Sequence, residues 1–263
     1  MSTTGGTEDG DRWIRRFHPS PASRVKLVCL AHAGGSANFY LPLSALLAPE
    51  VEVLAIQYPG RQDRWHEPVV ADIGTLADRI TAALRPWTGE PLALFGHSMG
   101  AVLGFEIARR LEAGPGRPPL ALFASGRRAP SRTRDERVHL LDDDDLVAEI
   151  EALQGTAPGA LADPELRALV LPGVRADYRA IETYRCPPGA TVATPVTVLI
   201  GDRDPRVDVA EAEAWFEHTT AATGLRVFPG GGHFYLADAW EEIAGRIRQD
   251  LALRPAAAPG RPG

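Results

Sequence analysis

A short glycine-flanked segment, Gly96-His97-Ser98-Met99-Gly100, contains the residue with the clearest chemical potential. It follows the apolar run at 91–95 and opens the helix-like stretch at 99–113. This order of strand, sharp turn and helix is typical of a nucleophile elbow. The turn strains the serine backbone, so that larger neighbours would clash, and it places the hydroxyl at a helix N-terminus, where developing negative charge is favoured. The segment predicts that Ser98 is a nucleophile.

A serine hydroxyl needs a general base and an acidic group that orients the base. For a serine on such an elbow the chain order is serine, then aspartate or glutamate, then histidine. His233 lies on a glycine-rich loop directly before the last predicted helix, and Asp202 and Asp204 follow the apolar run at 195–200. Spacing alone leaves open which aspartate holds His233, and the other would cap the turn or pair with a nearby arginine.

An oxyanion formed by attack of Ser98 needs two backbone N–H donors. One is expected from Met99, the residue after the nucleophile, and the other from the loop Ala33-Gly34-Gly35, which follows the first central strand. Small residues in that loop let the backbone approach a substrate closely.

The other histidines carry less information. His97 should point away from the Ser98 hydroxyl and pack or hydrogen-bond elsewhere, and His32 should shape its own loop. The remaining four are expected at the surface: His18, His66, His139 and His218. Because no pair has metal-ligand spacing on one helix, we predict no zinc or other metal site.

Strands and helices alternate along most of the chain, which predicts an α/β fold with a mostly parallel central sheet covered by helices on both faces. The predicted strands are 25–31, 51–57, 91–95, 120–126, 195–201 and 225–230. The predicted helices are 38–48, 70–85, 99–113 and 237–252.

A connection of almost 70 residues, between the strands that end near 126 and begin near 195, interrupts this alternation. It contains helical patterns at 143–154 and 163–184, and so long a connection usually forms a lid or binding cap. The alternative is an extra helical layer that only completes the core. We therefore expect a single domain over 13–253 with a lid insertion at about 127–190, a disordered leader at 1–12 and a disordered tail at 254–263.

Composition excludes several classes of protein. The 263 residues carry a net charge of −6, so nucleic-acid binding through bulk charge is not expected. No apolar run approaches the roughly 20 residues of a membrane-spanning helix, and the N-terminus has no signal-peptide pattern, which favours a cytoplasmic protein. Two cysteines, Cys29 and Cys186, cannot make a disulfide framework.

The sequence resembles the type II thioesterases, the free-standing editing hydrolases of polyketide and nonribosomal peptide assembly lines. The resemblance covers about residues 15–250. It rests on the segments His32-Ala33-Gly34-Gly35-Ser36, Tyr58-Pro59-Gly60-Arg61-Gln62-Asp63-Arg64 through Glu67-Pro68, Gly96-His97-Ser98-Met99-Gly100, Arg175-Ala176-Asp177-Tyr178 through Tyr184, Gly201-Asp202-Arg203-Asp204-Pro205 and Gly231-Gly232-His233-Phe234. The first two of these are more specific than the elbow, which all α/β-hydrolases share.

The resemblance implies an α/β-hydrolase fold with Ser98 as nucleophile, His233 as base and Asp204 as the orienting acid. It implies that the amides of Ala33 and Met99 are the oxyanion donors and that the helical lid covers an acyl chamber. The implied substrate is an acyl thioester on the phosphopantetheine arm of an acyl or peptidyl carrier protein in antibiotic biosynthesis. No cofactor is implied, and members of the family often act as monomers.

Two other functions remain open on the same residues: a broad carboxylesterase or lipase, and a non-catalytic protein that binds an acyl carrier. Carrier proteins are usually acidic, so docking to this acidic chain would need a local basic patch. Arg127, Arg128, Arg132 and Arg134 are the candidates, with a solvated arginine cluster as the alternative. The acidic run at 142–145 is expected instead to cap a lid helix.

Overall fold

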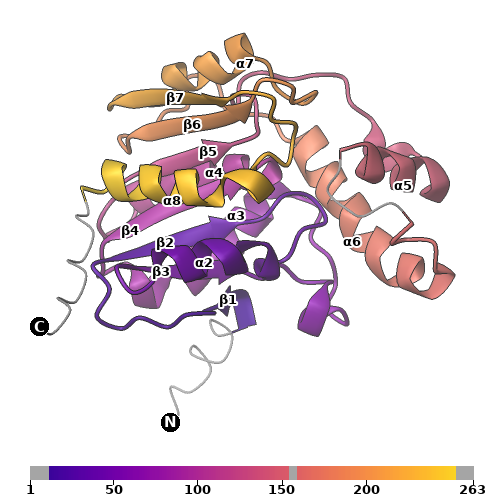
Figure 1. The fold of residues 1–263 in the computed structure, drawn as a ribbon, viewed down its shortest axis with the longest axis horizontal. Coiled ribbons are helices and arrows are strands. Elements are labelled where there is room, and N and C mark those ends of the chain that lie inside the picture. Colours follow the sequence, from indigo (N-terminus) through magenta and orange to yellow (C-terminus); the bar gives the residue numbers. More distant parts are fainter. Residues whose placement is uncertain (1–11, 154–158, 253–263) are drawn as a thin grey trace, which may run out of the picture.

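The computed structural model describes residues 12–153 and 159–252. Its centre is a seven-stranded sheet in the order β1-β3-β2-β4-β5-β6-β7 (Figure 1). β1 runs antiparallel to β3, and every other pair is parallel. The strands are β1 (Ile14–Arg15), β2 (Val25–Leu30), β3 (Val51–Ile56), β4 (Leu92–His97), β5 (Leu122–Ser125), β6 (Val196–Gly201) and β7 (Thr223–Phe228). The predicted mostly parallel sheet is confirmed.

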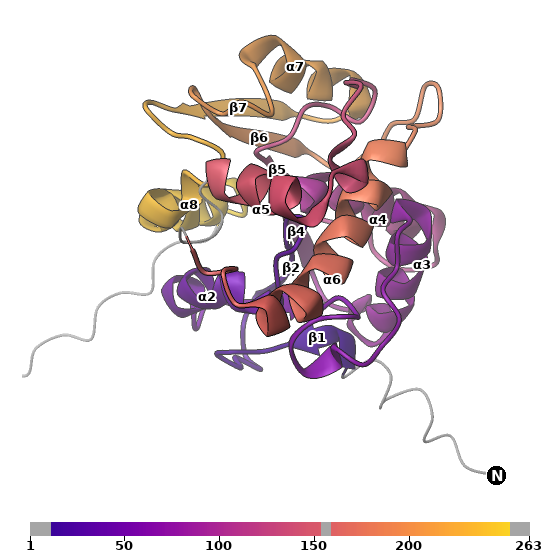
Figure 2. The same cartoon turned by 90° about the vertical axis from the view of Figure 1, so that its right-hand side faces the viewer.

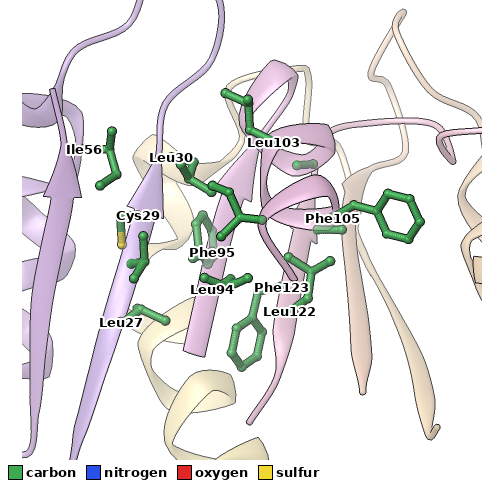
Figure 3. Close-up of a cluster of buried hydrophobic side chains, with 14 of the residues drawn as sticks. Leu27, Cys29, Leu30, Ile56, Leu94, Phe95, Leu103, Phe105, Leu122 and Phe123 are labelled. Carbon is green, nitrogen blue, oxygen red and sulfur yellow. The ribbon is translucent and has the colours of Figure 1, made fainter. Parts of the chain in front are cut away.

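The apolar runs of the sequence become strands because both faces of the sheet are covered. Every residue of β2 and of β4 is buried. Figure 3 shows side chains of neighbouring strands, among them Leu27, Phe95 and Phe123, packed together in this core with Leu103 and Phe105 from the helix after β4. A strand buried on both faces reads as a continuous apolar run rather than an alternating one.

Helices cover the two faces of the sheet. α2 (Leu41–Leu47) and α8 (Leu236–Asp250) lie on one face and contact each other, whereas α3 (Ile73–Ala83) and α4 (Met99–Ala113) lie on the opposite face (Figure 1). A short helix beside the β6–β7 edge, α7 (Val209–Glu213), was not predicted.

Two further helices lie across one end of the sheet, α5 (Asp143–Ala152) and α6 (Pro164–Thr183) (Figure 2). They form a small hydrophobic cluster of their own, separate from the main core, which includes Leu146, Leu161 and Val174. The acidic run acts as expected, because the Asp142 side chain accepts a hydrogen bond from the Asp145 amide and caps α5.

The predicted leader at 1–12, apart from its last residue, and the predicted tail at 254–263 lie outside the described residues. Within the described ranges, no helix is long and apolar enough to cross a membrane. The same ranges contain no cluster of histidine, cysteine, aspartate and glutamate side chains suited to a metal ion.

Candidate active site

Ser98 adopts the strained backbone expected of an elbow, with φ +55° and ψ −116°. The flanking glycines are required by close backbone approach. A Cβ on Gly96 would lie 2.0 Å from the Gly100 carbonyl oxygen, and a Cβ on Gly100 would lie 2.0 Å from the Leu30 carbonyl oxygen. The Ser98 amide donates to the Ser125 carbonyl of β5 at 2.8 Å, which anchors the turn to the sheet.

The loop after β7 brings His233 onto the loop after β6. The two Asp204 carboxylate oxygens lie 3.0 and 2.9 Å from His233 Nδ1, and both side chains are buried. Asp202 has a different partner, since it accepts the Gly230 amide at 2.6 Å. Of the two aspartates that spacing left open, Asp204 is therefore the one in contact with the imidazole.

Ser98, His233 and Ala33 line the same small pocket, of about 30 Å³. Because His233 Nδ1 is engaged by Asp204, the Nε2 atom is the ring nitrogen left for proton exchange in that pocket. The Ser98 hydroxyl has no hydrogen-bond partner among the described residues, so it is free for a substrate. The structure thus places Ser98 and His233 at one pocket, with Asp204 in contact with His233.

In the loop between β2 and α2, two backbone amides are already paired within the protein. The Gly35 amide donates to the His32 carbonyl at 2.9 Å, and the Gly34 amide donates to the Asp177 carboxylate at 2.8 Å. In the part of the chain that the structure describes, the amides of Ala33 and Met99 have no acceptor. Both N–H groups that were predicted to bind an oxyanion are therefore unpaired in this part of the chain.

A larger chamber of about 420 Å³ adjoins the pocket. One wall is the loop that contains Ala33, and another is built by side chains of the helical connection between β5 and β6. The residues of that connection are Ile150, Leu153, Leu161, Val170, Val174 and Tyr178. Phe39 and Phe234 complete the lining. The shape and lining suit an apolar group attached to a carbonyl at Ser98.

His97 and His32 are neutral side chains near the site, and His32 lines both the small pocket and the larger chamber. His97 is fully buried and shares a hydrogen bond with the Ser125 hydroxyl at 3.0 Å, and burial followed by the nearby His233 lowers its pKa well below the usual value. His32 packs edge-on against Phe39 and Phe234. Burial, with smaller effects of His233 and Arg61, lowers the pKa of His32 to about 3. Neither ring competes with His233 for a proton near neutral pH.

The expectation that four other histidines lie at the surface is wrong for His218 and holds only in part for His139 and His18. His218 is buried, with its two ring nitrogens on the Ala190 carbonyl and the Ser131 hydroxyl. His139 is half-buried and pairs with Glu182. His18 is also half-buried, beside the Ser44 hydroxyl at 3.0 Å, and His66 is exposed.

The proposed basic docking patch does not form as expected. Arg127 and Arg128 are buried, and Arg128 is paired with Glu136. The two exposed members are also paired, Arg132 with Glu217 and Arg134 with Glu211. Burial and the neighbouring Arg128 lower the pKa of Arg127 to about 9. The cluster is largely internal and offers little free positive charge to a partner.

Two polar residues of the site had no assigned role at the sequence level, Arg61 and Asp177. Both belong to segments that carry the family resemblance, and that was the only signal for them. Arg61 Nη1 and Nη2 donate hydrogen bonds to Asp177 Oδ2 and Oδ1 at 2.6 and 2.9 Å. The pair lies directly behind the loop that holds Ala33.

Known proteins are similar to this chain both in sequence and in fold. Residues 25–251 match the family model described as thioesterase domain. A protein of Streptomyces griseus named probable cadicidin biosynthesis thioesterase is 54% identical over 248 residues, which cover 94% of this chain and 68% of that protein. Thioesterase PikA5 of Streptomyces venezuelae is 49% identical over 254 residues, with 96% and 90% covered.

A solved structure described as the type II thioesterase BorB from the borrelidin biosynthetic cluster superposes with a TM-score of 0.85. The two chains are 50% identical, and the match covers 92% of this chain and 98% of the other. Ser98, Asp204 and His233 lie within the matched residues 25–251.

Proposed function

The chain belongs to the thioesterase domain family, and from this premise we propose that it removes misprimed or stalled acyl groups from the phosphopantetheine arms of carrier proteins. The names of its relatives support this substrate class, because they place those proteins in cadicidin and borrelidin biosynthesis. An apolar chamber beside Ser98 supports an acyl group as the part of the substrate that is bound.

In the proposed reaction Ser98 attacks the thioester carbonyl while His233 Nε2 takes the hydroxyl proton. Asp204 holds the imidazole by Nδ1 and stabilises the imidazolium. The Ala33 and Met99 amides stabilise the oxyanion, and each such donor is typically worth about 10²–10³ in rate. The tetrahedral intermediate collapses to an acyl-serine, and His233 returns the proton to the departing thiolate.

The second half of the reaction releases the acid. Water gives a proton to His233 and attacks the acyl-serine, the same amides hold the new oxyanion, and collapse restores the Ser98 hydroxyl. A thiol has a pKa of about 8.5, far below that of an alcohol, so expulsion of the carrier arm needs little acid assistance. A triad of this kind therefore serves thioesters without further machinery.

The observation that carries the proposal is the contact of both Asp204 oxygens with His233, in the pocket that also contains Ser98. Two alternatives use the same geometry differently: a carboxylesterase or lipase would accept oxygen esters, and a carrier-binding protein would not use the hydroxyl. Both are separated from the proposal by one substrate panel.

The test compares the wild type with Ser98→Ala on acyl-pantetheine thioesters, acyl-carrier thioesters and matched oxygen esters. We expect the wild type to hydrolyse both thioesters faster than the oxygen esters, and Ser98→Ala to lose nearly all hydrolysis while it still binds the acyl carrier. Undiminished hydrolysis by Ser98→Ala would contradict the assigned nucleophile. Faster cleavage of the oxygen esters would favour the esterase.

A further inference from the structure

The Asp177 carboxylate is buried on α6, far from the nucleophile in sequence, and three N–H groups converge on it. Two belong to the Arg61 guanidinium, which binds the carboxylate in the bidentate manner. The third is the Gly34 amide, at 2.8 Å from Oδ2. A carboxylate that is 1% exposed is stable as a charge only with such partners.

Arg61 also holds the loop directly, because its Nη1 donates a hydrogen bond to the Gly35 carbonyl oxygen at 3.0 Å. The loop is therefore held by two hydrogen bonds, from the Gly34 N–H to Asp177 and from Arg61 to the Gly35 carbonyl oxygen. Gly34 has φ +77°, and a Cβ there would lie 2.9 Å from Val174 Cγ2 of α6. The backbone, the ion pair and the lid helix thus form one contact.

This contact fixes the direction of the Gly34 amide, which points at Asp177, and holds the peptide plane between Ala33 and Gly34. The next amide back along the chain, that of Ala33, has no acceptor among the described residues, and Ala33 lines the pocket with Ser98. Misplacement of a reacting group by about 1 Å can cost about 10²-fold in rate.

We propose that Asp177, with Arg61, is a positioning residue for the oxyanion hole, and that α6 must be seated for the Ala33 amide to be correctly aimed. The lid then does more than cover the acyl chamber: its docking completes the catalytic geometry. This inference rests on the proposed function, since it needs an oxyanion to form at Ser98.

The test uses full-length Asp177→Asn and Arg61→Lys. The first keeps the shape of the side chain but removes its charge, and the second keeps a positive charge but removes the bidentate contact. Asp135→Asn is the matched control, because Asp135 forms an exposed ion pair with Arg137 in the same connection. Each variant is assayed for kcat and KM on an acyl-pantetheine thioester. Its affinities are measured for an acyl trifluoromethyl ketone, which forms an oxyanion with Ser98, and for an acyl-pantetheine amide, which does not.

We expect Asp177→Asn to lower kcat about 10- to 100-fold and to weaken the ketone in parallel, while KM and the amide affinity stay close to wild type. Arg61→Lys should show a smaller change of the same kind, and Asp135→Asn no change. Equal weakening of ketone and amide, or an unchanged kcat, would overturn the positioning role. If Asp177→Asn does not fold, Arg61→Lys decides by the same comparison.

Ser98→Ala in the same assay distinguishes failure of the proposed function from failure of the positioning role. If it retains hydrolysis, the proposed function fails. If it abolishes hydrolysis while Asp177→Asn keeps the wild-type kcat, only the positioning role fails.

Discussion

Asp202 and Asp204 are two residues apart in the chain but differ in what they touch. Asp204 is buried against His233, whereas Asp202 accepts the Gly230 amide at the surface of the same turn. We expect Asp204→Asn to lower kcat by about 10⁴, because an amide stabilises the imidazolium poorly and favours the wrong tautomer. Asp202→Asn should leave kcat near the wild-type value. Steady-state hydrolysis of one thioester by both variants checks this, and similar losses at the two positions would contradict the assignment.

Gly100 illustrates how little room the elbow leaves. A Cβ at this position would lie 2.0 Å from the Leu30 carbonyl oxygen, and the Leu30 backbone belongs to β2 of the central sheet, so it cannot easily move aside. We expect Gly100→Ala to cost more than about 3 kcal/mol in the free energy of unfolding. Gly245→Ala is the control, since nothing lies near that Cβ on the exposed side of α8. This change should stabilise the fold by up to about 1 kcal/mol. Urea unfolding of both variants tests the contrast.

His32 makes stability depend on pH. Its folded-state pKa of about 3 lies below the ordinary value of 6.5, so between these limits the unfolded chain binds a proton that the folded chain does not. Stability therefore falls as the pH drops through this window. Since one pKa unit corresponds to about 1.4 kcal/mol and the residue as a whole is half-buried, we expect His32 to account for about 1 kcal/mol of loss from pH 6.5 to pH 5.

The check is urea unfolding of wild type, His32→Asn and the exposed-site control His66→Asn at the two pH values. His32→Asn should lose less stability on acidification than the other two. A slope unchanged by His32→Asn would show that this ring titrates normally.

At the scale of elements, apolar runs were sufficient to predict β2 through β6, because strands covered on both faces have no polar side to interrupt the pattern. β7 was predicted from the run at 225–230, although it lies at the edge of the sheet and only Phe228 in it is buried. β1 has only two residues, and Ile14 and Arg15 form a strand because they pair with Ile56 and Ala55. A segment so short has no periodicity of its own. α7 was missed for the same reason, although the box between Asp208 and Glu211 caps it.

Side-chain environments were less predictable than elements, because the partners come from distant segments. His218 is buried by contacts with Ala190 and Ser131, and Arg128 is neutralised by Glu136 across a bend in the lid connection. The residues next to His218 or Arg128 in the sequence do not predict these distant partners. Spacing did not separate Asp204 from Asp202, and only the family resemblance implied Asp204; its contact with His233 depends on the meeting of two loops. Ser98 and His233 were predicted from their motifs and their order in the chain.

The lid helix α6 supplies a wall of the chamber, so its side chains should limit acyl length. Val170 lines the chamber, whereas Ala168 on the same helix is exposed. We expect Val170→Trp to reduce kcat/KM for octanoyl-pantetheine at least about tenfold relative to acetyl-pantetheine, because the added ring fills volume that a long chain needs. Ala168→Trp should leave this ratio unchanged. If Val170→Trp lowered both substrates equally, the acyl chain would have to lie elsewhere.

The whole molecule has a net charge of −6, and the arginines once expected to offset it locally are buried or paired with glutamates. An acidic carrier protein should therefore be repelled at long range, and the Debye length shortens from about 30 Å at 0.01 M salt to about 10 Å at 0.1 M. We expect kcat/KM for an acyl-carrier thioester to rise over this range, while that for the uncharged acyl-pantetheine thioester stays constant. The second substrate controls for effects of salt on the site itself. A fall in kcat/KM for the carrier substrate would mean that attraction to a basic surface dominates docking, contrary to the internal pairing of these arginines.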